Sequence, residues 1–199
     1  MKKIGAVILA AGLARRMGEQ KLLLPFGGKP LVAHVLATAA ALPFAAVIAV
    51  IGEPRLELEK VCQQYGIPSI YNSQAHEGQS TSLKLGLWQL PRDLDGFIFL
   101  QGDQPLMAGG LLQRLMDRFQ DHPDGIIVPS YHGEYRSPAL FGARWWEKLA
   151  EISGDRGGRS VIMNHLEAVI PVEWDEEQSF WDVDTGEDYD RLVRRGCHG

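Results

Sequence analysis

Cysteine is scarce in this 199-residue chain, which has only Cys62 and Cys197. Two cysteines cannot build the disulfide framework of a small secreted domain, and they are typical of a protein of the reducing cytoplasm. Basic residues are not in excess either, because 20 lysines and arginines stand against 25 aspartates and glutamates, a net charge of −5. This balance argues against nucleic acid as a partner. We therefore expect a cytoplasmic protein that does not bind nucleic acid.

The beginning of the chain shows no secretory signal, since Met1 to Ile4 lead directly into a strand-like stretch without a small-residue cleavage site. Segment 31–52 has no Asp, Glu, Lys or Arg and is long enough to reach across a bilayer. It is rich in alanine and is interrupted at Pro43, and Ala46–Ile51 after the proline has the pattern of a short buried strand. We expect a helix followed by a strand here, and no membrane partner.

The whole chain alternates short apolar segments with segments of helical spacing. The expected strands are Ile4–Leu9, Ala46–Ile51, Ser69–Tyr71, Gly96–Leu100, Gly125–Val128, Pro138–Phe141, Ala168–Val172 and Phe180–Val183. The expected helices are Pro30–Ala41, Pro54–Tyr65, Ser80–Leu90 and Ala108–Phe119. Strands that are apolar throughout indicate a sheet covered on both faces, and the alternation indicates βαβ units. We predict a single α/β domain with a doubly wound, mostly parallel sheet.

In such sheets, ligands bind beyond the carboxyl ends of the strands. The first expected strand is followed by a stretch of small residues and then by Lys21, and the third is followed by Asn72. Asp103 comes shortly after the fourth, and the last one ends in Asp182 and Asp184. Charged and polar residues therefore recur at one edge of the sheet, where we expect the functional site.

The turn after the first strand is suited to a polyphosphate. Small residues let backbone N–H groups approach an anion closely, and the turn from Gly12 onward carries Arg15, Arg16 and Lys21. It is not a P-loop, because five residues separate Gly12 from Gly18 and no Lys-Ser or Lys-Thr follows. It is not the dinucleotide fingerprint G-x-G-x-x-G either, which weakens the case for a dinucleotide-dependent oxidoreductase. A solvated basic turn is the structural alternative.

The carboxylates at the same edge are candidate metal ligands. Asp103 follows a buried strand close to the phosphate turn, which makes it a ready ligand for Mg²⁺. Asp182 and Asp184 would share one face of an extended segment, so either could reach the metal, and Asp184 lies nearer the strand end. A turn residue before Pro105 is the alternative for Asp103. A helix N-cap that forms a capping box with Glu187 is the alternative for Asp184.

One motif carries a resemblance to a known family. The run Leu9-Ala10-Ala11-Gly12-x-x-x-Arg16-Met17-Gly18-x-x-Lys21, followed by Leu22-Leu23-Leu24-Pro25, resembles the signature of the MobA-like nucleotidyltransferases, closest to the molybdenum cofactor cytidylyltransferases. The resemblance extends over nearly the whole chain, through Asn72 and segments 77–83, 102–105, 154–159 and 182–185. It implies a Rossmann-like nucleotidyltransferase domain over 1–199, with the nucleotide site in the N-terminal half and the acceptor site in the C-terminal half.

The resemblance also implies a role for each matching residue. Nucleotide binding would involve Leu9, Ala10, Ala11, Gly12, Arg16, Lys21, Asn72, Gly78, Ser80 and Ser82. The catalytic residues would be Lys21, Arg16 and Asp103, and the Mg²⁺ ligands Asp103 and Asp184. The acceptor would contact Arg136, Asp155 and Arg159. The sequence departs from many relatives at Arg136-Ser137-Pro138, where they have Gly-His-Pro. The phosphate turn reads Leu-Ala-Ala-Gly, whereas the guanylyl branch has Leu-Ala-Gly-Gly, which indicates CTP rather than GTP.

The implied activity is transfer of CMP from CTP to the phosphate of the molybdenum cofactor, molybdopterin, with Mg²⁺ required and pyrophosphate released. An acceptor phosphate is already ionised, so positioning and charge neutralisation by Lys21 and Mg²⁺ suffice without a strong general base. Two alternatives remain open. One is nucleotidyl transfer from another NTP to a different small phosphate, and the other is a non-catalytic carrier that delivers the cofactor to a client molybdoenzyme.

Overall fold

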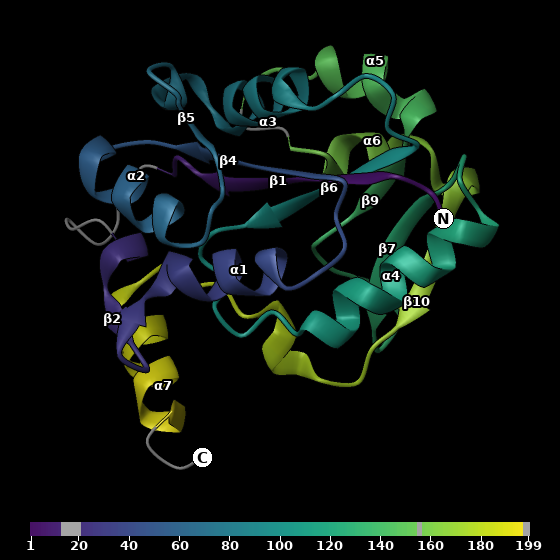
Figure 1. Ribbon diagram of the computed structural model, residues 1–199. Coiled ribbons are helices and arrows are strands. Elements are labelled where there is room, and N and C mark those ends of the chain that lie inside the picture. The colour runs from purple at the N-terminus through teal and green to yellow at the C-terminus, as the bar shows by residue number, and fades with distance from the viewer. Residues whose placement is uncertain (13–20, 155–156, 197–199) are drawn as a thin grey trace.

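A computed structural model describes residues 1–12, 21–154 and 157–196 (Figure 1). Within these residues, eight strands form one sheet in the order β10-β7-β9-β6-β1-β4-β5, with β8 paired to β7. The strands are β1 Ile4–Ala10, β4 Ala46–Ile51, β5 Ser69–Tyr71, β6 Gly96–Gln101, β7 Ile126–Tyr131, β8 Glu134–Tyr135, β9 Leu140–Gly142 and β10 Val169–Glu173. The helices are α1 Leu31–Ala40, α2 Arg55–Gln64, α3 Gln79–Gln89, α4 Gly109–Asp121, α5 Trp146–Ala150, α6 Arg159–Asn164 and α7 Gly186–Gly196.

The direction of the strands confirms the prediction of a mostly parallel sheet. Strand β1 is parallel to both of its neighbours, β4 and β6, and β4 is parallel to β5. Strand β10 is parallel to β7. Strand β9 lies between β6 and β7 and is antiparallel to both. The carboxyl ends of β1, β4, β5 and β6 therefore meet at one edge, as the sequence analysis requires.

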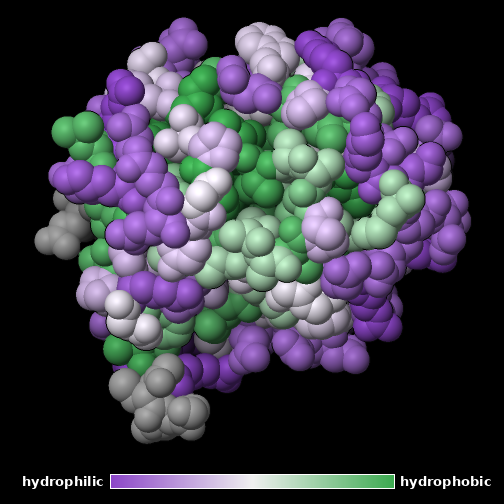
Figure 2. All heavy atoms as spheres, viewed as in Figure 1, coloured by the Kyte–Doolittle hydropathy of each residue, from purple (hydrophilic) through white to green (hydrophobic). Residues whose placement is uncertain are grey.

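Helices cover both faces of the sheet, which explains why β1 is buried at every residue (Figure 1). Successive side chains of a strand point to opposite faces. Ala6 and Ile8 accordingly pack in the cluster formed with α1, α2 and α4. Val7 and Leu9 pack in the cluster formed with α3, α5 and α6. The hydrophilic residues gather around the rim of the face seen in Figure 2, with apolar residues visible between them.

Segment 31–52 forms helix α1 and strand β4, which confirms the expected helix followed by a strand. No helix in the described part of the chain has the length and apolar character needed to cross a membrane. The expected strand Phe180–Val183 is wrong. A 3-10 helix spans Glu177–Phe180, and the residues after it run without a strand partner. Val183 is buried there against Leu31 and Leu192, so its apolar character serves a helix contact and not a sheet.

The C-terminal helix α7 packs beside a small hairpin formed by β2 (Pro25–Phe26) and β3 (Lys29–Pro30), at the left of Figure 1. The Tyr189 hydroxyl donates a hydrogen bond to the Pro25 carbonyl oxygen at 2.6 Å. This contact joins the end of the chain to the segment that follows Lys21. The residues before α7 are thereby held near the carboxyl edge of the sheet.

Cys62 lies on α2 and is fully buried, and burial raises the pKa of its thiol to about 11. We predict that iodoacetamide modifies Cys62 in the native protein more slowly than in the unfolded protein by a factor on the order of a hundred, because the thiolate is the nucleophile. Peptide mass spectrometry after timed alkylation near neutral pH, with and without guanidinium chloride, measures both rates. Equal rates would show that the site is accessible.

Candidate active site

The backbones at the ends of β1 and β6 stay hydrogen-bonded to each other at the carboxyl edge. The Gly102 N–H donates to the Leu9 carbonyl oxygen at 3.0 Å. A Cβ atom at position 102 would lie only 3.0 Å from that same oxygen, so glycine allows this approach. The next residue, Asp103, is thereby placed beside the turn that begins after Ala10.

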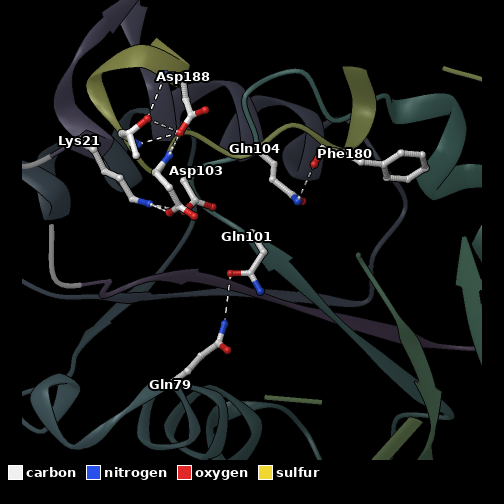
Figure 3. A network of polar contacts seen from close by, with 9 residues as sticks. Lys21, Gln79, Gln101, Asp103, Gln104, Phe180 and Asp188 are labelled. Carbon is white, nitrogen blue, oxygen red and sulfur yellow. Dashed lines mark hydrogen bonds and ion pairs between the residues drawn. The ribbon is translucent and has the colours of Figure 1, made fainter. Parts of the chain in front are cut away.

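Lys21, Asp103 and Asp184 meet at this edge although they are far apart in the sequence. The Lys21 Nζ atom lies 2.6 Å from Asp103 Oδ2, a contact shown in Figure 3, and 2.8 Å from Asp184 Oδ1. Lys21 is only 8% exposed, whereas the Asp184 side chain is about half exposed. The structure therefore brings together the predicted lysine and both predicted metal-binding carboxylates.

The charges in this group control its protonation. Burial alone lowers the pKa of Lys21, but the carboxylates of Asp103 and Asp184 outweigh that effect and hold the pKa above its usual value. The lysine is thus a permanent cation near neutral pH. Partial removal of water raises the pKa of Asp182, and the nearby charges of Asp103 and Asp184 raise it further. With Lys21 as the cation, these carboxylates give the site an excess of negative charge.

A capping box next to Asp184 leaves its side chain available to Lys21. The Thr185 N–H and hydroxyl both donate to Asp188 Oδ2, at 2.8 and 2.7 Å, and the Asp188 N–H returns a bond to the Thr185 hydroxyl at 3.2 Å. The capping pair is Thr185 with Asp188, so the alternative of an Asp184–Glu187 box is wrong. The Val183 N–H also donates to the Asp103 carbonyl oxygen at 3.1 Å, which ties this segment to the end of β6.

A cavity of about 410 Å³ opens beside the three charged residues. The predicted residues that line it are Leu9, Ala11, Gly12, Lys21, Gly78, Ser82, Asp103 and Asp184. The side chain of Ala10 is buried in the core and does not reach the cavity. Arg16 lies outside the described residues. His76, Gln79 and Gln101 also line the cavity. His76 and Gln79 belong to the segment around Gly78 that the sequence predicts to hold the nucleotide, whereas no role is predicted for Gln101.

Asn72 and Ser80 support the wall of this cavity but do not line it. The Asn72 side chain is 5% exposed, and its nitrogen donates to the hydroxyls of Thr81 and Ser82 at 2.9 and 2.8 Å. Its oxygen accepts from the Gln74 N–H at 2.9 Å. The N–H of Ser80 donates to the Gly154 carbonyl oxygen at 3.1 Å. Both residues therefore hold the segment that contains Gly78 and Ser82 against the end of the sheet.

Gly78 has a backbone φ of 116°, at the point where a 3-10 helix (Ala75–Glu77) ends and α3 begins. A side chain strains this conformation, so glycine is required for the turn. Gly78 lines the cavity at this turn, and its carbonyl oxygen accepts from the N–H and the hydroxyl of Thr81.

A second, larger cavity of about 770 Å³ adjoins the first, and Leu9, Gln79 and Gln101 line both. Figure 3 shows Gln79 and Gln101 facing each other at this boundary, with 3.4 Å between Nε2 and Oε1. Two predicted acceptor residues, Arg136 and Arg159, line the larger cavity. Its apolar wall is formed by Leu83, Phe99, Val128, Phe141 and Phe180. Asp155 lies outside the described residues.

The two arginines of the larger cavity differ in their contacts. Arg136 forms an ion pair with Glu134 at 2.7 Å, so part of its charge is already balanced. Arg159, the first residue of α6, has no ion-pair partner in the described part of the chain. An unpaired guanidinium at a cavity is well suited to bind a phosphate, with which it forms paired hydrogen bonds.

A further cavity of about 700 Å³ lies near Gly125, His165 and Trp145. It adjoins the amino end of β7, whereas ligands of parallel α/β sheets bind at the carboxyl ends of strands. The two cavities that share Leu9 are therefore the better candidate for the functional site. Within the described ranges, no group of three or more His, Cys, Asp or Glu side chains is arranged to hold a metal ion.

The chain shares its family and fold with known proteins. A family model described as the MobA-like NTP transferase domain matches residues 6–169. The purine catabolism protein PucB of Bacillus subtilis (strain 168) is 30% identical over 198 residues, which span 95% of each chain. The predicted resemblance to this family is thereby confirmed.

Solved structures agree on the fold. Rv0371c from Mycobacterium tuberculosis H37Rv superposes with a TM-score of 0.88 at 26% identity, over 97% of this chain and 98% of that one. The same protein has been solved in complex with manganese, with a TM-score of 0.81 at 25% identity over 96% and 98% of the two chains. A CMP:2-keto-3-deoxy-manno-octonic acid synthetase complexed with CTP gives a TM-score of 0.79 at 17% identity over 98% of each chain, which shows the fold alone. The predicted Rossmann-like nucleotidyltransferase fold is confirmed.

The capping box gives a testable prediction. We expect Thr185→Ala to lower the free energy of unfolding by about 1 kcal/mol, because it removes the side-chain partner of the first turn of α7. Thr185→Ser keeps a hydroxyl at the same place and is expected to match the wild type within about 0.5 kcal/mol. Urea denaturation followed by circular dichroism measures both. A Thr185→Ala variant as stable as the Ser variant would contradict the assignment.

Proposed function

This chain belongs to the MobA-like NTP transferase domain family, and we propose that it transfers CMP from CTP to the phosphate of the molybdenum cofactor, molybdopterin, with release of pyrophosphate. The match to this family makes the chain a member of the nucleotidyltransferase superfamily. The identities of the nucleotide, the acceptor and the metal ion are what we propose. The observation that carries it is the meeting of Lys21, Asp103 and Asp184 beside two adjoining cavities. One cavity is suited to a nucleotide and the other to a phosphorylated acceptor.

The carboxylates fit a divalent cation. Asp103 Oδ2 and Asp184 Oδ1 both lie within 2.8 Å of one cationic atom, Lys21 Nζ, so they already converge on a positive charge. Two carboxylates against one lysine leave one net negative charge, and carboxylate oxygens are the ligands that Mg²⁺ prefers. The manganese complex of the relative Rv0371c supports a divalent metal in this family. Asp103 and Asp184 would hold Mg²⁺, which when bound would neutralise phosphate charge and stabilise the leaving pyrophosphate.

The smaller cavity is suited to the triphosphate. The small residues Ala11 and Gly12 line it, and N–H groups of such residues can approach phosphate oxygens closely. Lys21 adds a buried cation whose interaction with a phosphate is stronger than in water, because the surroundings screen it less. We assign Lys21 to the α-phosphate, where charge develops during transfer. Ser82 lines the same cavity, and its hydroxyl, which accepts from Asn72, would donate to the rest of the nucleotide.

The larger cavity is suited to the acceptor. The unpaired guanidinium of Arg159 would bind the acceptor phosphate and turn one of its oxygens toward the shared wall at Leu9 and Gln101. That oxygen forms a bond to the α-phosphorus, and the bond from the α-phosphorus to the bridging oxygen of pyrophosphate breaks. The acceptor is ionised before it reacts, so no proton has to be removed.

A non-catalytic carrier is the weaker alternative. A protein that only holds a cofactor for a client molybdoenzyme has no use for a buried lysine between two carboxylates in the wall of the smaller cavity. A nucleotidyltransferase that uses another NTP or a different small phosphate would keep the same arrangement. A panel of NTPs and phosphate acceptors, read by pyrophosphate release and by the mass of the product, tests the proposal. Product from CTP and molybdopterin supports it, and turnover with a different pair contradicts it.

Replacement of Lys21 tests its role. We expect Lys21→Ala to lower kcat by a factor on the order of a hundred, because one donor at the developing charge is lost. Lys60→Ala, at an exposed position on α2, is the matched control and is expected to have normal kcat. Steady-state pyrophosphate release gives both values. Equal turnover in the two variants would remove Lys21 from the mechanism.

Replacement of Asp103 tests the metal site. We expect Asp103→Asn, which keeps the shape but not the charge, to lower activity by a factor on the order of a hundred or more at every Mg²⁺ concentration, since a metal ligand is lost. Asp175→Asn, at an exposed position, serves as the control and keeps the normal Mg²⁺ response. Activity measured over a series of Mg²⁺ concentrations separates the two. A Mg²⁺ response of Asp103→Asn like that of the control argues against the site.

A further inference from the structure

Gln104 is a buried amide in the wall of the larger cavity and has an unused oxygen. The residue is only 4% exposed and follows Asp103 directly. Its nitrogen Nε2 donates to the Phe180 carbonyl oxygen at 3.5 Å (Figure 3). Its oxygen Oε1 has no hydrogen-bond partner within the described residues. Buried polar atoms are almost always paired, so this oxygen calls for a partner that the described chain does not supply.

The contact with Phe180 determines which end of the amide is free. A flipped Gln104 would place its oxygen against the carbonyl oxygen of Phe180, and two acceptors repel each other. The nitrogen therefore faces the carbonyl group, and the oxygen is left as an acceptor without a partner in the described part of the chain. A ligand satisfies this oxygen only with an N–H or O–H group.

The surroundings of Gln104 favour a flat ring with polar edges. Phe99, Phe141 and Val128 contribute apolar surface to the same cavity, which suits the faces of an aromatic heterocycle. Arg159 lines the cavity and is suited to a phosphate on the same molecule. Asp182 also lines it and is a further acceptor for N–H groups.

We propose that Gln104 accepts, through Oε1, a hydrogen bond from an N–H group on the ring edge of the acceptor molecule, and that it is a specificity-determining residue. This inference rests on the proposed function, in which the acceptor is molybdopterin, whose pterin ring carries N–H groups on its edge. A site built around a buried acceptor rejects molecules without the matching donor, because its oxygen is then left unpaired. Gln104 thus selects the acceptor and takes no part in the chemical step.

The first experiment measures binding without turnover. The full chain is titrated with 6-hydroxymethylpterin by isothermal calorimetry, as wild type and as Gln104→Met, which keeps the length of the side chain but has no oxygen. We expect the Kd of Gln104→Met to rise about tenfold, the usual effect of one lost hydrogen bond in a buried site. The control Gln178→Met, at an exposed position on the neighbouring 3-10 helix, is expected to bind like the wild type.

A second measurement needs no variant and so does not depend on how Gln104→Met folds. The wild-type protein is titrated with a pterin that is methylated on N3 and dimethylated on the exocyclic amine, so that this edge has no N–H group. We expect about tenfold weaker binding than for the unmethylated pterin. Equal binding of the two pterins, no binding of the unmethylated pterin, or unchanged binding by a folded Gln104→Met would each overturn the inference.

Kinetics separates this inference from the proposed function. With CTP and molybdopterin, we expect Gln104→Met to raise the KM for the acceptor about tenfold and to leave the KM for CTP and kcat near wild type. Pterin binding that depends on Gln104, without any transfer from CTP, would reject the proposed function and keep the inference. Transfer from CTP with the same acceptor KM in the wild type and in Gln104→Met would support the proposed function and reject the inference.

Discussion

A buried ammonium group between two carboxylates is the interaction on which the site depends. Lys21 Nζ contacts Asp103 at 2.6 Å and Asp184 at 2.8 Å, and these residues come from the segment after β1, the end of β6 and the segment before α7. A buried lysine without partners would lose its proton or destabilise the fold. The carboxylates therefore keep it charged, and the lysine in turn holds three distant segments together at one point.

The parallel sheet makes this meeting possible. Strands β1 and β6 run side by side in the same direction, so the residues after them emerge at the same edge. The third segment, which contains Asp184, is positioned by helix α7. This helix packs on the hairpin β2–β3, and the capping box of Thr185 and Asp188 makes it begin just after Asp184. Two cavities adjoin each other at this edge, and Leu9, Gln79 and Gln101 line both of them. That arrangement suits a reaction that joins two molecules.

Much of the fold could be predicted because its signals are local. The strands with continuous apolar residues and the helices between them follow from the pattern of hydrophobic residues. In segment 31–52, the proline indicates a helix followed by a strand and not one membrane-spanning helix. The prediction of a strand at Phe180–Val183 is wrong because Val183 packs against Leu31 and Leu192 and not in a sheet. A contact between residues so far apart in the sequence leaves no local pattern. Asn72 and Ser80 show the same limit, since a polar residue at a strand end can bind a ligand or support its neighbours. In the structure Asn72 contacts Thr81 and Ser80 contacts Gly154, and neither residue lines the smaller cavity.

The order and nature of the residues by themselves determined the α/β class, the edge of the sheet that carries the site, and the identity of Lys21 and Asp103 as its charged members. These follow from hydrophobic periodicity and from short motifs, which depend on neighbours in the sequence. Only the tertiary structure decided that Asp184 contacts the lysine, that Asp182 lines the larger cavity, and that Gln104 in the wall of that cavity has an unpaired oxygen. The physical reason is that these properties depend on distances between atoms that lie far apart in the chain.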